Sequence, residues 1–137
     1  MPPAPSHTRR GSAAVEFALT VPVLMVIIFG VLDYSWYIKQ ATDVVRATRE
    51  GLRLGVGVSQ DDGPDAAAES QTEIVLAGYG LDCESGLDCE IEAVNTTVDG
   101  LDAVTLTVVV PYEPLVGMVP APEQMRAEIT MALEDQS

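Results

Sequence analysis

The clearest pattern in the sequence is an apolar run in the first quarter of the chain. Between Gly11 and Asp33 the one charged residue is Glu16, and nearly all the others are apolar. A helix of roughly 20 apolar residues is long enough to cross the ~30 Å hydrocarbon core of a bilayer. The run therefore predicts a membrane-spanning helix with one carboxylate near its start.

The helical pattern continues beyond the apolar run. No proline interrupts residues 33–54, and apolar or aromatic residues recur there on one helix face: Tyr34, Tyr37, Ile38, Ala41, Val44, Val45 and Leu52. Two opposite-charge pairs fall four residues apart on the polar faces: Lys39 with Asp43, and Arg46 with Glu50. We predict one helix from about Ser12 to about Leu54. Its stripe is expected to cover a sheet of the same domain, with a subunit contact as the alternative.

A short second helix is expected after the first one ends. We expect three glycines, Gly51, Gly55 and Gly57, to loosen the end of the first helix. Residues 59–65 are rich in Gly, Pro and Asp and predict a loop. Residues 66–78 are then expected to form a helix that ends at Gly78. Its inward residues are expected to be Ala67, Ile74, Val75 and Ala77.

The last third of the chain has the alternation of β-strands. Strands are predicted at residues 89–98, 101–110 and 125–133, with an Asp99-Gly100 hairpin turn between the first two. Four prolines separate the second and third strands: Pro111, Pro114, Pro120 and Pro122. The predicted fold class is α+β. A long N-terminal membrane-spanning helix precedes a small domain in which a short helix packs on an antiparallel sheet of about three strands.

The two cysteines lie in a duplicated pentapeptide. Gly-Leu-Asp-Cys-Glu occurs at residues 80–84 and 86–90, with Ser85 between the copies. Outside the cytoplasm, Cys83 and Cys89 are expected to form a disulfide. The alternative is a cation-binding loop built from four carboxylates: Asp82, Glu84, Asp88 and Glu90. Their spacing matches no known calcium loop, so we predict the disulfide and no metal site.

The charge of the chain excludes several functions. The net charge is −14, and from Ser59 onward the sequence contains one basic residue, Arg126, and seventeen acidic ones. A nucleic-acid partner would need a basic patch and is not expected. The sole histidine, His7, lies before the apolar run, so no histidine-based catalytic or metal site is expected in the domain that follows the run. We predict no catalytic residues, no enzymatic activity and no cofactor.

The residues around the start of the apolar run resemble a known signal. A basic flank, Arg9 and Arg10, precedes Gly11, and Glu16 lies five residues beyond that glycine. This arrangement resembles the class III signal of type IV pilin-like proteins. The following residues, Glu16-Phe17 with Leu19, Pro22 and Leu24, more narrowly resemble the TadE-like minor pseudopilins of Tad (Flp-type, type IVb) pilus systems.

The resemblance implies how the chain is processed and assembled. A prepilin peptidase would cleave between Gly11 and Ser12, so that Glu16 becomes the fifth mature residue. Glu16 and Phe17 would then act in recognition and assembly with other pilin-like subunits and the Tad pilus machinery. On this reading residues 1–11 are a leader, residues 12–58 are the membrane and extended helix, and residues 59–137 are an extracytoplasmic pseudopilin domain.

The basic flank also predicts the orientation in the membrane. Positive residues favour the cytoplasmic side, so the N-terminus is expected in the cytoplasm and the domain outside the bacterial inner membrane. The resemblance further implies incorporation in a surface pilus. The alternative function is a signal-anchored extracytoplasmic binding domain without a role in a filament. The mature N-terminus separates the two readings: Ser12 favours the pseudopilin, and Met1 or Pro2 favours the binding domain.

Overall fold

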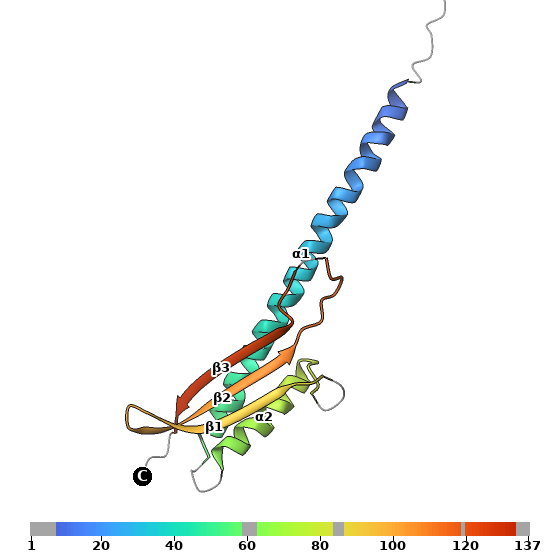
Figure 1. Ribbon diagram of the computed structural model, residues 1–137. Coiled ribbons are helices and arrows are strands. Elements are labelled where there is room, and N and C mark those ends of the chain that lie inside the picture. Colours follow the sequence, from blue (N-terminus) through green and yellow to red (C-terminus); the bar gives the residue numbers. More distant parts are fainter. Residues whose placement is uncertain (1–7, 59–62, 84–86, 119, 134–137) are drawn as a thin grey trace, which may run out of the picture. The chain divides into compact units, whose positions relative to one another are not determined.

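A computed structural model of the chain describes residues 8–58, 63–83, 87–118 and 120–133. The elements follow in the order α1 (Thr8–Gly55), α2 (Pro64–Gly78), β1 (Glu90–Val98), β2 (Leu101–Pro111) and β3 (Gln124–Ala132) (Figure 1). The predicted α+β class, with a long first helix, a short second helix and three antiparallel strands, is confirmed.

The described chain forms two compact units. The first contains α1 up to Trp36 together with residues 114–120. The second contains the remainder of α1 from Tyr37, then α2, the three strands and their connections. The chain therefore passes from the first unit into the second within α1, and it returns once, in the loop between β2 and β3.

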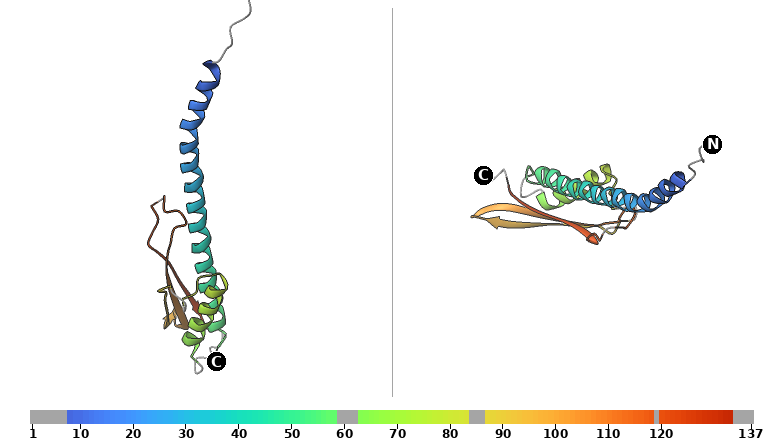
Figure 2. Two further views of the ribbon diagram at one scale, coloured as in Figure 1. Left: turned by 90° about the vertical axis from the view of Figure 1, so that its right-hand side faces the viewer. Right: turned by 90° about the horizontal axis from the view of Figure 1, so that it is seen from above.

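The sheet of the second unit has the order β1-β2-β3, and all its pairs are antiparallel. The inner face of the sheet carries the alternating apolar residues predicted from the sequence. Of β2, Val104, Leu106, Val108 and Val110 are fully buried. Ile91 of β1 and Ala127 of β3 flank Val108 in register. The C-terminal part of α1 and α2 cover this face, as the right-hand view of Figure 2 shows.

The turn between β1 and β2 is the predicted two-residue hairpin. Asp99 and Gly100 both have positive φ, 54° and 83°, and the register closes on the pair Val98–Leu101. Two positive φ angles define the type I′ turn, whose twist matches that of the flanking strands. The Asp-Gly pair thus sets the register that places the β2 valines on the inner face.

The glycines near the end of α1 form a close helix contact, which corrects the prediction that they loosen the helix. A Cβ on Gly55 would lie 2.6 Å from the Cβ of Ala68 and 2.7 Å from the carbonyl oxygen of Pro64. A Cβ on Gly51 would overlap the side chain of Thr72. Because Gly51 and Gly55 are four residues apart, they share one face of α1, and α2 packs directly on the backbone there.

The buried face of α2 also differs from the prediction. The buried residues are Pro64, Ala68, Thr72 and Leu76, whereas Ile74 is 62% exposed. The buried residues recur at a spacing of four, and Pro64, Ala68 and Thr72 are the ones that lie against Gly51 and Gly55 of α1. Thr72 satisfies its buried hydroxyl by donating to the carbonyl of Ala68 at 2.7 Å. The apolar character of the residues was therefore a poor guide to the face that packs.

α2 ends at Gly78, as predicted, but the left-handed residue lies two positions further on. The residue with positive φ is Gly80 (80°) rather than Gly78. The N–H of Leu81 donates to the carbonyl of Leu76, and the N–H of Gly80 donates to that of Ala77, both at 3.0 Å. This is the Schellman pattern, and its usual apolar contact is supplied by the buried Leu76 and Leu81.

Candidate functional site

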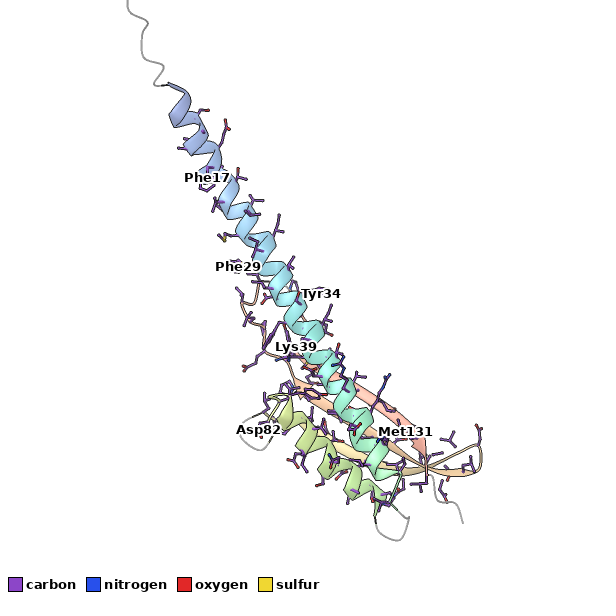
Figure 3. All side chains as sticks on the ribbon, turned by 180° about the vertical axis from the view of Figure 1, so that it is seen from behind. Phe17, Phe29, Tyr34, Lys39, Asp82 and Met131 are labelled. Atoms are coloured by element: carbon purple, nitrogen blue, oxygen red, sulfur yellow. A yellow bond between two sulfur atoms is a disulfide. The ribbon has the colours of Figure 1, made fainter. Side chains whose placement is uncertain are left out.

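The predicted assembly residues lie on an exposed part of α1. Ser12 Oγ donates a hydrogen bond to Glu16 Oε1 at 3.2 Å, so the carboxylate is directed back toward the helix start. Phe17 is 70% exposed, and no other element lies beside it in Figure 3. Glu16 and Phe17 are therefore available to a partner outside the described chain.

Gly11 lies inside α1, because the helix begins at Thr8 rather than near Ser12 as predicted. No described atom lies within 4 Å of a Cβ built on Gly11. Packing within the described chain therefore gives no reason for glycine at this position. A requirement for glycine here would have to come from an external partner such as a peptidase.

The apolar part of α1 has the properties of a membrane anchor. Among the described residues, one helix is long and apolar enough to cross a membrane, with a mean hydropathy of 2.5 in its best window. None of that window is buried within the protein. Pro22 lies inside this helix. The helix is thus consistent with a single membrane anchor.

A buried carboxylate follows the apolar run. Asp33 is only 3% exposed. Its Oδ1 accepts the backbone N–H of Val116 at 2.7 Å, and its Oδ2 accepts that of Met118 at 2.8 Å. Both carboxylate oxygens are used, and hydrogen bonds to a charged acceptor are stronger than neutral ones. Asp33 therefore clamps the loop between β2 and β3 to α1, within the first unit.

Gly117 gives the loop the shape that this clamp requires. Its φ is 76°, a conformation that other residues rarely adopt. The glycine lies between the two N–H donors, and such turns of backbone N–H groups form concave binding sites for anions. Sequence reasoning predicted an irregular, proline-rich crossing here and missed both the clamp and Asp33. The sequence did contain a signal for the clamp. It was the first acidic residue after an apolar run, together with a distant apolar loop that contains a glycine.

The two cysteines are joined as Cys83–Cys89, with 5.4 Å between their Cα atoms. The disulfide lies beside α2 and β1, where it lines a hollow of about 430 Å³ together with Glu69 and Glu73. Glu69 Oε1 accepts the N–H of Ala93 on β1 at 2.8 Å. The disulfide thus closes a loop at a point where α2 already contacts β1.

The alternative cation loop receives no support within the described part of the chain. No group of three or more described His, Cys, Asp or Glu side chains has the geometry of a metal site. Glu84, one of its four carboxylates, lies outside the described residues, as does His7.

The C-terminal part of α1 carries a basic groove in an acidic domain. Arg46, Arg49 and Arg53 line a hollow of about 420 Å³ with Glu50 and an apolar floor of Val75, Tyr79 and Met131. The predicted pair of Lys39 and Asp43 forms at 2.7 Å. Among the described side chains, Arg46 and Glu50 do not form the other predicted ion pair.

These sites fall into separate groups along the chain. The structure brings Ser12 close to Glu16, and it joins Cys83 to Cys89. It also unites Asp33 with a loop more than 80 residues away in sequence, a pairing that no local pattern encodes.

Comparison with known proteins gives a match at the start of the chain. A family model described as "TadE-like protein" matches residues 11–53, a segment that includes Gly11, Glu16, Asp33 and the arginines of the groove. No match was found among curated proteins or among solved structures. Residues 11–53 of the chain therefore match the TadE-like protein family, as the N-terminal motif predicted.

Proposed function

We propose that this protein is a structural minor pseudopilin that contributes to the assembly of a Tad (Flp-type) pilus or a related secretion filament. The observation that carries the proposal is the family match over a helix whose most apolar window is not buried within the described chain. An apolar helix of this length needs lipid or other apolar helices around it. A pilin-like subunit uses both environments in turn, first the membrane and then the filament.

Processing is the first step of the proposed function. A prepilin peptidase cleaves between Gly11 and Ser12, which removes the basic flank and creates an α-ammonium group on Ser12. The new cation lies one helical turn from Glu16. The existing bond from Ser12 Oγ to Glu16 supports this geometry, because it already orients the carboxylate toward the new terminus.

Pairing between subunits is the second step. In the filament, the Glu16 carboxylate pairs with the Ser12 ammonium of a neighbouring pilin-like subunit. Each group then relieves the desolvation cost of the other, whereas a misplaced helix leaves both charges unpaired in apolar surroundings. Glu16 would therefore determine the register and incorporation of the subunit rather than the fold of its domain.

The mature N-terminus tests the proposal. The protein is isolated from the membranes of its native host, and its intact mass is measured. We expect a chain that begins at Ser12. A chain that begins at Met1 or Pro2 would instead support the alternative, a signal-anchored extracytoplasmic binding domain.

Two variants of Gly11 make the test specific. Gly11→Trp should block cleavage, since the peptidase must enclose an extended backbone at this position. Gly11→Ala is the matched control, and we expect it to be processed better than Gly11→Trp. Neither side chain meets a described atom near its Cβ, so the two variants should fold alike. Normal processing of Gly11→Trp would contradict the proposal.

A further inference from the structure

The loop between β2 and β3 presents an apolar surface within the first unit. Residues 114–118, PLVGM, contain no charged residue and no side chain that forms strong hydrogen bonds. Three large apolar side chains of this loop, Leu115, Val116 and Met118, are each about half exposed. An exposed apolar cluster of this kind marks a contact with a membrane or another protein.

The anchor point of the loop is the end of the apolar run in α1. Asp33 is the first charged residue after that run, and it holds the loop through the N–H groups of Val116 and Met118. On α1 the residues just before Asp33, Val31 and Leu32, are also exposed. The loop and the last turn of the apolar run therefore both expose apolar side chains near the Asp33 clamp.

The clamp removes a polar obstacle to membrane contact. A backbone N–H that enters an apolar phase without a partner costs several kcal/mol. Here two loop N–H groups are bonded to the carboxylate, and the same bonds satisfy both oxygens of Asp33. The polar groups of loop and helix are thus directed at one another, and the side chains of Leu115, Val116 and Met118 remain exposed.

We infer that this loop inserts into the interface of the lipid bilayer, as a second membrane contact beside the span of α1. Lipid is the occupant favoured by the structure, because Asp33 anchors the loop at the end of an apolar run whose most apolar window is entirely unburied. The inference rests on the proposed membrane anchoring of α1 but not on cleavage or filament assembly. Its functional consequence is that the loop fixes the depth and rotation of α1 before assembly.

The test uses the full chain in vesicles of phosphatidylcholine and phosphatidylglycerol. Single cysteines at chosen positions are labelled with the environment-sensitive dye NBD; Cys83 and Cys89 do not react, since they are joined. Quenching by lipids that carry nitroxides at shallow or deep positions then reports contact with lipid and its depth.

Three label positions make the result decisive. Leu115→Cys reports on the loop, and Val26→Cys reports on the apolar span. Leu101→Cys is the matched control: it is also a leucine, 50% exposed against 57% for Leu115, but it lies between Gly100 and Asp102. We expect quenching at Leu115 to exceed that at Leu101 at least threefold, with the shallow nitroxide most effective. At Val26 the deep nitroxide should be most effective.

The outcomes separate the inference from the anchoring on which it rests. Strong quenching at Val26 with equal, weak quenching at Leu115 and Leu101 would overturn the loop insertion alone. Weak quenching at Val26 as well would overturn the anchoring. A blue-shifted but unquenched label at Leu115 would mean that protein covers the loop, and this result would also overturn the inference.

The clamp itself is tested by Asp33→Asn, which removes the charge and replaces one acceptor by a donor. We expect quenching at Leu115 to fall at least twofold while quenching at Val26 is retained. Gly117→Val is a second variant that strains the loop at its positive φ and leaves α1 unaltered. Unchanged quenching at Leu115 in both variants would show that the clamp does not hold the loop in the bilayer.

Discussion

The two parts of α1 use apolar residues in opposite ways. In the first unit, residues such as Val15, Leu19 and Val26 are exposed. In the second unit, Val44, Ala47 and Leu52 recur on one face and are fully or almost fully buried against the domain. The first part therefore depends on surroundings outside the described chain, whereas the second is completed by the fold of the chain itself.

The acidic residues of α1 follow the same division. Glu16 has a hydroxyl neighbour, Ser12, among the described side chains. Asp43, in the second unit, forms an ion pair with Lys39, and its side chain is 9% exposed. Between them in sequence, Asp33 is bonded to the backbone of a distant loop. Glu16 thus has no ion pair among the described side chains, and our proposal gives it a cationic partner in a neighbouring subunit.

The largest effect on stability is expected from Leu52→Ala. Leu52 is fully buried, and removal of a large apolar side chain from a core costs about 3 kcal/mol. The free energy of opening is measured by amide hydrogen exchange of β2 in the full chain in micelles. Leu24→Ala, in the exposed apolar part, is the matched control and should leave the exchange of β2 unchanged. An equal increase in the hydrogen exchange of β2 in both variants would contradict the contrast between the two parts of α1.

A somewhat smaller loss, about 2 kcal/mol, is expected from Gly51→Ala. Its Cβ would overlap Thr72 and lie 2.9 Å from the carbonyl oxygen of Ala68, so α1 and α2 must separate. Gly11→Ala has open space and should not affect the exchange of α2 amides. Slower exchange in α2 after Gly51→Ala would show that the glycine contact is not a tight one.

The differences between sequence prediction and structure have a common physical cause. Period and turn chemistry are local, so the hairpin at Asp99-Gly100 and the alternation of β2 could be read directly from the sequence. The use of Gly51, the packing face of α2 and the partner of Asp33 depend on which segments meet in space. The sequence predicts that Gly51 loosens the helix end, because a glycine that permits close packing has the same local sequence signal.

The disulfide is expected to contribute less, about 2 kcal/mol or below, because the loop it closes is short. The double variant Cys83→Ser, Cys89→Ser should increase the hydrogen exchange of β1 and α2 amides. It should leave the apolar part of α1 unaffected. In the exported protein, mass spectrometry without reduction should find the mature chain two hydrogens lighter than its reduced form; complete alkylation without reduction would contradict the pairing.

The smallest effect is expected from Ser12→Ala. This change removes the hydroxyl bonded to Glu16 but retains the α-ammonium group that cleavage creates. Incorporation into pili should fall by about twofold, because one exposed hydrogen bond to the carboxylate is lost, at the lower end of the usual contribution of about 0.5–1.5 kcal/mol. A loss as large as that caused by neutralising Glu16 would assign the effect to the hydroxyl rather than to the ammonium.

The most direct test of the account is the amount of this chain in pili when Glu16→Gln is the sole copy in the native host. Glu92→Gln, at an exposed position of β1, is the matched control. We expect membrane insertion and the fold of the domain to be retained in both strains. Incorporation should fall at least tenfold in Glu16→Gln alone. Incorporation of Glu16→Gln at the wild-type level, with normal numbers of pili, would contradict the pairing of Glu16 with a neighbouring subunit.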